Sequence, residues 1–437
     1  MRGFFFAYQI RTTMLKKLYT IFLEHPEVCI DTRAINPGCI FFALKGPTFN
    51  ANEFAVTALE KGASIAIVDE EKYVLDDRYI LVDDVLSTLQ SLANKHRKKL
   101  KCPIIAITGT NGKTTSKELL YRVLGQKFIT SATKGNLNNH IGVPLSLLAI
   151  TSGTEYGIIE MGANHEQEIA FLCSLAEPDI GIITNIGKAH LEGFGSLDGV
   201  LRAKTELYSF LGDTKAKIFT KDNQQNLLEL LPKESQNYTY GQLDSSNYTV
   251  KFISAQPYVS VSVGELIIES KLIGDYNFDN IALSIAVGNY CGVEMERIKD
   301  AIETYIPTNN RSQLIETDQN SILLDAYNAN PMSVEKAIHN MLLIDHTHKV
   351  LILGDMFELG TETEREHISI INYCLSAGFS NVYLVGKAFD LANNTEYASF
   401  PTNQELKNTL KKSPIKNAFI LIKGSRGMKL EEIVKLL

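Results

Sequence analysis

Short continuous runs of apolar residues alternate along the chain with stretches whose apolar positions have helical spacing. In the first hundred residues, the runs at 40–44, 65–68 and 79–82 predict strands, and the stretches at 54–61 and 85–99 predict helices. The second of these helices ends in basic residues, which the negative end of a helix dipole favours. We therefore expect this part of the chain to fold as a small α/β domain.

The second segment continues the pattern with longer apolar runs. The runs at 104–107, 157–160 and 180–184 are typical of strands that are covered on both faces of a parallel sheet. Residues 247–272 are rich in strand signals, and a helix is expected over 277–288. A mostly parallel sheet with helices is therefore expected here as well.

The third segment begins near Pro307 and again alternates strands with helices. The pattern predicts a doubly wound sheet whose strands include 321–324, 350–353, 382–385 and 418–422. No internal repeat and no low-complexity tract interrupts the three segments. The fold class predicted from the pattern is therefore α/β throughout.

Composition narrows the class of protein. A chain of 437 residues is too long for one ordinary core, and 45% hydrophobic with 21% charged residues is typical of globular proteins. The net charge of -7, with no basic block longer than 96–99, gives no electrostatic reason to expect nucleic acid as a partner. The six cysteines lack metal-ligand spacing, which favours reduced thiols in a cytosolic protein.

The first thirteen residues do not fit a targeting segment. The apolar stretch at 4–8 is too short for a signal sequence, and no small-residue cleavage site follows it. No apolar run approaches the roughly 18 to 20 residues that a membrane span needs. Because a good amphipathic helix start follows Met14, we expect Met14 to be the true start and residues 1–13 to be a mis-assigned extension.

One loop carries a specific chemical signal. A predicted strand and a predicted helix are joined by Gly109, Thr110, Asn111, Gly112, Lys113, Thr114 and Thr115. The glycines let backbone N–H groups face phosphates, and the helix N-terminus adds positive potential. Lys113 would reach the outer phosphates of a nucleotide, and the Thr114 hydroxyl would bind Mg²⁺. Only two residues separate the glycines, against four in the usual pattern, so this is a short variant of a phosphate loop; a chance glycine-rich turn is the weaker alternative.

This short loop resembles the ATP-binding signature of the Mur ligase and folylpolyglutamate synthetase superfamily. Four further motifs, in the same order, resemble one branch of the Mur ligases: GNLNNHIGVP at 135–144, DAYNANP at 325–331, LGDMFELG at 353–360 and KGSRG at 423–427. The resemblance runs from Asp31 to the C-terminus. Agreement of several ordered motifs makes it far more specific than the loop alone.

The resemblance implies three domains and an ATP-dependent ligase. The implied domains are a UDP-substrate-binding domain over 1–100, a central ATP-binding domain over 101–306 and a C-terminal Rossmann-like ligase domain over 307–437. The implied reaction joins D-Ala-D-Ala to the terminal carboxylate of a UDP-N-acetylmuramoyl tripeptide through an acyl phosphate, releasing ADP. Such an enzyme would serve peptidoglycan synthesis in the cytoplasm as a monomer, without nucleic acid or stable membrane association. The third peptide residue, meso-diaminopimelate or lysine, stays open.

The resemblance also implies two Mg²⁺ ions beside the catalytic Lys113. Thr114 and Glu160 would hold one ion, because a carboxylate at the end of a strand beside a phosphate loop is well placed for it; an ordinary strand-end charge is the alternative. His190, at the same sheet edge, and Lys204 would hold the other. In related ligases the lysine that matches Lys204 is carbamylated, which turns a cation into an anion that can bind Mg²⁺. By sequence alone, Lys204 is a surface helix lysine.

Four residues outside the loop are implied to contact ATP. The amides of Asn277 and Asn280 can pair with adenine, with helix capping by Asn277 as the alternative. The family usually has His where this chain has Tyr276. Arg311 and Asp325 resemble residues that reach the nucleotide from the domain junction, and a plain salt bridge is the alternative for each.

Substrate contacts are implied in all three segments. Thr32, Arg33 and Gly46 resemble the UDP-binding part of the family, and an arginine with small polar side chains suits a diphosphate. The family often has Asp-Gly-His soon after this glycine, whereas residues 50–52 here are Asn-Ala-Asn, so an ordinary turn stays open as the alternative. Candidates for the muramoyl peptide and the incoming dipeptide are Asn138, Asn139, Asn328 and Asn330.

Two other functions stay open at this point. A sister ligase would add one amino acid to a UDP-muramoyl dipeptide, or glutamates to folate; the motif at 327–331 argues against both. A non-catalytic nucleotide-binding regulator on the same scaffold would not need Lys113, Glu160, His190 and Lys204, all of which are present. A substrate panel in a phosphate-release assay separates these functions.

Overall fold

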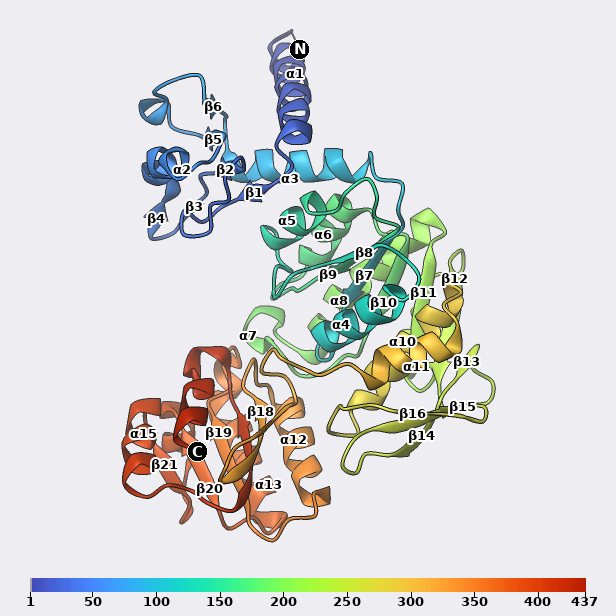
Figure 1. Ribbon diagram of the computed structural model, residues 1–437, viewed down its shortest axis with the longest axis vertical. Coiled ribbons are helices and arrows are strands. Elements are labelled where there is room, and N and C mark those ends of the chain that lie inside the picture. The colour runs from blue at the N-terminus through green and yellow to red at the C-terminus, as the bar shows by residue number, and fades with distance from the viewer. Residues whose placement is uncertain (1) are drawn as a thin grey trace. The chain divides into compact units, whose positions relative to one another are not determined.

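Figure 1 shows the computed structural model of the protein, which describes residues 2–437 and, for side chains, residues 13–437. The chain divides into two compact units, one of residues 1–107, 128–163 and 167–181 and the other of residues 108–127, 164–166 and 182–437. Helix α1 (Arg2–Glu24) opens the first unit. The prediction of a start at Met14 concerns residues 1–13, of which Met1 and the side chains up to residue 12 lie outside the described part.

The first unit contains a four-stranded parallel sheet of order β1-β2-β5-β6. Its core includes Phe41, Ala55, Ala66 and Val68, which pack together as buried side chains. The elements of this region are β1 (Val28–Cys29), β2 (Ile40–Phe42), β5 (Ile65–Val68), β6 (Tyr79–Leu81), the antiparallel pair β3 (Lys45–Gly46) and β4 (Phe49–Asn50), η1 (Ala51–Phe54), α2 (Ala55–Glu60), η2 (Glu71–Tyr73) and α3 (Val85–Arg97). The strands and helices predicted here are confirmed.

The first unit also holds α5 (Gly142–Leu148) and α6 (Glu168–Ala176), which pack with α3. Arg97 at the end of α3 closes the C-terminus of α6. Its guanidinium donates to the carbonyls of Ala176 and Glu177, each at 2.7 Å, and pairs with Asp179 at 2.8 Å. These bonds satisfy carbonyl groups that the end of a helix leaves without partners.

A seven-stranded sheet has the order β13-β12-β11-β10-β7-β9-β8. Its pairs β7–β9, β8–β9, β11–β12 and β12–β13 are all parallel. The strands are β7 (Ile104–Thr108), β8 (Thr130–Ala132), β9 (Tyr156–Glu160), β10 (Ile180–Ile183), β11 (Lys217–Lys221), β12 (Gln236–Gly241) and β13 (Tyr248–Thr249). Every residue of β7 and β10 is buried, as the continuous apolar runs predict.

In the second unit, the helices α4 (Lys113–Leu124), α10 (Asn277–Tyr290) and α11 (Met295–Glu303) pack against one another. The strand-rich stretch of the prediction forms a three-stranded antiparallel sheet, β14-β15-β16. The other elements here are β14 (Lys251–Ser254), β15 (Ser260–Val263), β16 (Leu266–Glu269), α7 (Leu191–Phe194), α8 (Leu197–Thr214) and α9 (Gln225–Leu228).

The C-terminal part of the second unit is a six-stranded sheet of order β17-β18-β22-β19-β20-β21, parallel except for β17 at the edge. Alternate residues of each strand enter two separate cores. Leu323, Leu351 and Leu421 pack with α12 (Pro331–Leu343) and α13 (Thr363–Ser376), whereas Ile322, Ile352 and Ile420 pack with α15 (Asn403–Lys412). Helices therefore cover both faces, and the predicted doubly wound sheet is confirmed. The remaining elements are β17 (Gln313–Glu316), β18 (Asn320–Asp325), β19 (Lys349–Gly354), η3 (Gly360–Glu362), β20 (Val382–Val385), α14 (Lys387–Ala392), β21 (Ala398–Phe400), β22 (Ala418–Lys423), η4 (Arg426–Met428) and η5 (Leu430–Leu436).

Two further features concern the chain as a whole. Within the described residues, none of the helices has both the length and the apolar character that crossing a bilayer requires. The six cysteines form no disulfide bonds within the described residues, and burial raises the pKa of the Cys374 thiol to about 12. The predicted α/β class with mostly parallel sheets is confirmed, and the three domain boundaries stay a prediction.

Replacing Ile420 with alanine is expected to destabilise the C-terminal sheet. Ile420 has no exposed surface and lies on β22, between β18 and β19. The expected loss in the free energy of unfolding is about 2–5 kcal/mol, measured by urea unfolding. Leu391→Ala is the control, because that side chain is 86% exposed and its removal should change the free energy by less than about 0.5 kcal/mol. Equal losses in the two variants would contradict the assignment of this core.

Candidate active site

The loop between β7 and α4 approaches neighbouring segments so closely that glycine is required. Gly109 has a φ angle of +135° and Gly112 one of +81°, both in the region that favours glycine. A Cβ atom on Gly109 would lie 2.1 Å from Oγ1 of Thr184, and one on Gly112 would lie 2.5 Å from Oδ1 of Asn280. The backbone of the loop is thereby held at the N-terminus of α4, where the helix dipole favours an anion.

Thr184 and Asn185, directly after β10, hold this loop in place. The Thr184 hydroxyl donates to the carbonyl of Asn111 at 2.6 Å. The side-chain amide of Asn185 donates to the same carbonyl and accepts the N–H of Asn111, each at 3.0 Å. The Asn185 side chain therefore pairs with the Asn111 backbone much as a neighbouring strand would, and these bonds hold the loop to the end of β10.

Lys113 and Thr114 open α4 directly beneath the loop. The Lys113 ammonium donates to the carbonyls of Gly109 at 2.6 Å and Thr110 at 3.0 Å, which places its charge over the loop. Thr114 is buried, and Thr115 follows in the same helical turn. The loop residues predicted from the sequence therefore gather at one helix N-terminus.

Asn277 and Asn280 form a buried chain of amides below the loop. Asn280 accepts a hydrogen bond from the Ser116 hydroxyl at 2.9 Å and donates to Asn277 at 2.8 Å, and Asn277 donates to the carbonyl of Ile273 at 2.8 Å. The alternative of helix capping is not observed, since no side chain caps α10. These bonds support the loop from below; the predicted adenine contacts stay a prediction.

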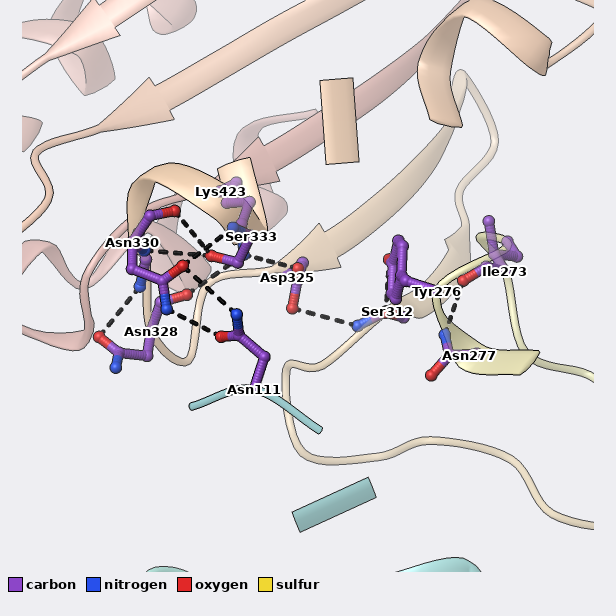
Figure 2. A network of polar contacts seen from close by, with 11 residues as sticks. Asn111, Ile273, Tyr276, Asn277, Ser312, Asp325, Asn328, Asn330, Ser333 and Lys423 are labelled. Carbon is purple, nitrogen blue, oxygen red and sulfur yellow. Dashed lines mark hydrogen bonds and ion pairs between the residues drawn. The ribbon is translucent and has the colours of Figure 1, made fainter. Parts of the chain in front are cut away.

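A polar network connects this region to the C-terminal sheet, as Figure 2 shows. The Tyr276 hydroxyl lies 2.9 Å from the Ser312 hydroxyl, and the N–H of Ser312 donates to Asp325 at 3.4 Å. Asp325 pairs with Lys423 at 2.7 Å, and Lys423 also donates to the carbonyl of Asn328 at 3.2 Å. Burial raises the pKa of Tyr276, so the hydroxyl stays protonated. Asp325 thus has the salt bridge that was the alternative to a nucleotide contact, and it holds Lys423 buried at the sheet edge.

Asn330 joins the phosphate loop to α12. Its side-chain oxygen accepts the N–H of Ser333 at 2.9 Å while the Ser333 hydroxyl accepts the N–H of Asn330 at 3.1 Å, a capping box at the start of α12. The Asn330 amide nitrogen also donates to the side chain of Asn111 at 2.8 Å (Figure 2). One side chain therefore caps a helix of the C-terminal sheet and contacts the loop at the start of α4.

Arg311 and Arg426 gather at the ring of Tyr327. The guanidinium carbon of Arg311 lies 3.8 Å from the ring centroid and that of Arg426 lies 5.0 Å from it, so both cations contact the same π system. The Nε atom of Arg311 is buried without a hydrogen-bond partner within the described part of the chain. A buried donor of this kind fits an anionic oxygen such as that of a phosphate.

His190 and Lys204 meet at another aromatic ring, that of Phe194. Lys204 on α8 is 2% exposed, and its ammonium lies 5.1 Å from the ring centroid. The His190 ring stands edge-on to Phe194 with centroids 6.3 Å apart. Nδ1 of His190 also contacts Oε2 of Glu358, and this contact lowers the pKa of the Glu358 carboxyl. The structure thus brings two of the predicted metal-binding residues to one place.

Glu160, Asn138 and Asn139 belong to the first unit. Glu160 is 1% exposed at the end of β9 and accepts a hydrogen bond from the Asn138 amide at 2.8 Å. Asn139 accepts the N–H groups of Ile141 and Gly142, at 3.1 and 2.9 Å, and so fixes the start of α5. Asn138 therefore orients a predicted metal ligand, and Asn139 has a local structural role beside its predicted substrate contact.

The predicted UDP-binding residues lie at the surface of the first unit. The Arg33 side chain is 87% exposed, and its guanidinium pairs with Asp31 at 2.6 Å. The hydrogen bond from Arg33 lowers the pKa of Asp31 to about 2. The carbonyl of Thr32 accepts a hydrogen bond from Lys61 at 2.9 Å, and a Cβ on Gly46 would lie 2.2 Å from the Phe49 ring. Arg33 is therefore exposed and paired with Asp31, and its contact with a diphosphate stays a prediction.

The Asn50-Ala51-Asn52 stretch, where the chain departs from the usual pattern, is part of a buried network. Asn52 is fully buried; its amide donates to Asn50 and to Asp69, each at 2.8 Å, and its oxygen accepts the N–H of Asp69 at 3.0 Å. Lys45 pairs with Asp69 at 2.9 Å and with Glu70 at 3.2 Å. The two asparagines therefore shape the turn after Gly46.

The donor set fits a nucleotide and Mg²⁺. The glycine loop, Lys113 and the unpaired Nε of Arg311 suit phosphate oxygens. The Thr114 hydroxyl and Glu160 carboxylate are the oxygen ligands that Mg²⁺ prefers, and His190 has one ring nitrogen beyond its contact with Glu358. Lys204 fits a cation only if its nitrogen carries a carboxylate. The described residues contain no group of three His, Cys, Asp or Glu side chains arranged to hold a metal ion by themselves.

Several contributing residues were missed by sequence reasoning. Thr184 and Asn185 follow β10 at the carboxyl end of a parallel strand, the same signal that pointed to Glu160, and could have been found by it. Ser312 and Glu358 could not, because their roles depend on contacts with residues distant in sequence: Tyr276 for Ser312, and His190 for Glu358.

Comparison with known proteins matches two domain families. Residues 107–288 match the Mur ligase middle domain, and residues 310–426 match the Mur ligase, glutamate ligase domain. The UDP-N-acetylmuramoyl-tripeptide–D-alanyl-D-alanine ligase of Bacillus subtilis (strain 168) is 33% identical over 446 residues, covering 98% of this chain and 96% of that protein.

Solved structures agree with these matches. A crystal structure of MurF from Acinetobacter baumannii has a TM-score of 0.82 at 28% identity, covering 94% of this chain and 92% of its own. The MurF ligase from Thermotoga maritima, solved in complex with ADP, has a TM-score of 0.80 at 25% identity, covering 94% and 96%.

Replacing Asn330 is expected to separate its two roles. Asn330→Ala removes both the helix cap and the bond to Asn111 and should lower the free energy of unfolding by about 1 kcal/mol. Asn330→Ser keeps a capping hydroxyl, but the serine side chain is too short to reach Asn111. Its free energy of unfolding should therefore fall by only a few tenths of about 1 kcal/mol. Thermal and urea unfolding measure both variants. Equal destabilisation by serine and alanine would contradict the capping role.

Proposed function

The chain belongs to the Mur ligases, in the family of UDP-N-acetylmuramoyl-tripeptide–D-alanyl-D-alanine ligases, and we propose that it forms the amide bond between the tripeptide carboxylate and the amine of D-Ala-D-Ala at the expense of ATP. The similarity to the Bacillus subtilis ligase over nearly the whole of both chains supports this. The observation that carries the proposal is the glycine loop at the start of α4, joined through Asn111 and Asn330 to the C-terminal sheet. This bond supports the proposal because it joins the glycine loop to the C-terminal sheet, whose segment of the chain carries the ligase motifs.

The reaction requires two displacements. An oxygen of the tripeptide carboxylate attacks the γ-phosphorus of ATP, the bond to the β-phosphate oxygen breaks, and ADP leaves with an acyl phosphate formed on the substrate. The amine nitrogen of D-Ala-D-Ala then attacks the acyl carbon and loses a proton, the bond from that carbon to the phosphate oxygen breaks, and inorganic phosphate leaves. Catalysis of the first step depends on positioning and charge neutralisation rather than on a protein nucleophile.

The residues of the chain can supply both requirements. The N–H groups at the start of α4 and the ammonium of Lys113 neutralise phosphate charge, and Thr184 and Asn185 keep the loop in its binding shape. Arg311 reaches the phosphates through its unpaired Nε, and Tyr327 holds its guanidinium in place. Asn277, Asn280 and Asp325 are the proposed contacts around the nucleotide. The side-chain amides of Asn277 and Asn280 also support the loop from below.

Two Mg²⁺ ions complete the proposed site. Bound Mg²⁺ neutralises the negative charge of the phosphates during transfer. Thr114 and Glu160 hold one ion, and His190 and carbamylated Lys204 hold the other. The burial of Lys204 beside α7 supports this, because the side chain is only 2% exposed and its nitrogen and the His190 ring both contact Phe194.

The remaining sequence-based predictions complete the proposal. Thr32, Arg33 and Gly46 bind the UDP moiety within a domain of residues 1–100, and Asn138 and Asn139 contact the muramoyl peptide within a central domain of residues 101–306. Asn328 and Asn330 contact the dipeptide in a domain of residues 307–437. The exposure of the Arg33 side chain supports its role. The enzyme acts as a cytoplasmic monomer in peptidoglycan synthesis.

Phosphate release in the presence of Mg-ATP, UDP-muramoyl tripeptide and D-Ala-D-Ala tests the function. Release is expected only with all three substrates, together with a UDP-muramoyl pentapeptide product identified by mass. Lys113→Ala should lower turnover on the order of 100-fold to 1,000-fold, because a preorganised phosphate contact is lost. Lys99→Ala, at an exposed lysine, is the control and should leave turnover unchanged. Release with a single amino acid instead of the dipeptide would identify a sister ligase, and near-normal turnover of Lys113→Ala would refute the site.

Carbamylation of Lys204 has a direct spectroscopic test. Protein equilibrated with ¹³C-bicarbonate should show a carbamate carbon in its ¹³C NMR spectrum, because the neutral amine of Lys204 adds CO₂ and releases a proton. The signal should be absent from Lys204→Arg, which keeps the positive charge but cannot carry the modification. A wild-type spectrum without this carbon would remove Lys204 from the proposed metal ligands.

A further inference from the structure

The contact between His190 and Glu358 lies outside the reaction scheme above. Nδ1 of His190 contacts Oε2 of Glu358, whose side chain is half exposed. His190 directly precedes α7, whereas Glu358 belongs to the 353–360 motif that follows β19 of the C-terminal sheet. The pair therefore connects a proposed metal ligand to a motif of the ligase domain.

The backbone at both residues is held in an unfavourable conformation. His190 has a φ angle of +52° and Glu358 one of +62°, in the left-handed region that residues other than glycine rarely occupy. Such conformations persist only where the surrounding structure enforces them, and they cluster at functional sites. Two of them in direct contact argue that the placement of this pair is specified by the fold.

Neighbouring contacts supply that enforcement. The N–H of Glu192 donates to the carbonyl of Glu358 at 3.3 Å, and Lys188 pairs with the buried carboxylate of Glu366 at 2.9 Å. A Cβ added to Gly360 would lie 3.4 Å from the Cα of Glu192. The segment at 188–192 is therefore attached to the segment at 358–366 on both sides of the contact between His190 and Glu358.

The chemistry of imidazole gives the contact a consequence for metal binding. A carboxylate at Nδ1 stabilises the tautomer that carries its proton on Nδ1. The lone pair then lies on Nε2, and the carboxylate also fixes the orientation of the ring. Carboxylate–histidine pairs of this kind are the usual second partners of histidines that bind metal ions.

We propose that Glu358 is a positioning residue, which holds His190 in the Nδ1–H tautomer and so presents Nε2 to the metal ion beside the transferred phosphate. The inference rests on the proposed function for the identity of that ion, but the tautomer itself does not depend on it. Because Glu358 comes from the ligase domain, the metal site gains its oriented histidine only when the 353–360 motif lies against α7.

The test compares three glutamate variants of the full chain, free of metal and nucleotide. Glu358→Leu removes the acceptor, Glu358→Gln keeps an acceptor without the charge, and Glu364→Gln is the matched control at an exposed carboxylate of the same segment. ¹⁵N-labelled histidine NMR at a pH of about 8.5, well above the ordinary imidazole pKa, reports the tautomer, and a His190→Gln spectrum assigns the signal. Wild type, Glu358→Gln and the control should show Nδ1–H, and Glu358→Leu should change to Nε2–H.

A second measurement gives the functional weight of the pair. Mn²⁺ replaces Mg²⁺ as the probe, and its affinity in the presence of ADP is measured by electron paramagnetic resonance. Affinity should fall by about 10-fold to 100-fold in Glu358→Leu, by less in Glu358→Gln and not at all in the control. Unchanged tautomer and unchanged Mn²⁺ affinity in a folded Glu358→Leu variant would overturn the proposal and leave the pair as a simple link between segments. If the wild-type protein shows the Nδ1–H tautomer but does not join D-Ala-D-Ala to the tripeptide, the result contradicts the proposed function alone.

Discussion

The close approach of the loop backbone to Thr184 and Asn280 is the constraint on which the rest of the site depends. Because Gly109 and Gly112 have no Cβ, the loop backbone can come close enough to be held from two sides, by the end of β10 and by the amides of α10. The position of Asn111 follows from this, and through Asn330 so does the link to α12. Protein contacts thus hold the loop in one conformation, which reduces the conformational entropy that binding to the loop has to cost.

Buried charge is the second organising feature of the molecule. Lys423 and Asp325 form a pair at the end of two adjacent parallel strands, β22 and β18, and the pair is further bonded to Asn328 and Ser312. A buried pair of this kind contributes little net stability, but removal of one partner leaves a charge without compensation. The KGSRG motif therefore begins with a residue whose first role is to hold the DAYNANP motif in place.

Much of the fold could be predicted from the sequence, because its signals are local. The continuous apolar runs of β7, β9 and β10 and the alternating cores of the C-terminal sheet follow from which faces are buried. The loop residues and Glu160 were predictable for the same reason, since a strand end and a helix start place them. The pairing of His190 with Glu358, and of Tyr327 with two arginines, depends on which distant segments meet, and no local pattern encodes that.

The ring of Tyr327 also offers a spectroscopic opportunity. The chain contains no tryptophan, so an indole introduced at position 327 would be the only one in the protein. It would lie against the guanidinium groups of Arg311 and Arg426, whose positive charge shifts indole emission according to its distance and orientation. Movement of the linker that carries Arg311 relative to the ligase domain would then shift the wavelength of the fluorescence emission. This shift can be followed in real time without an attached dye.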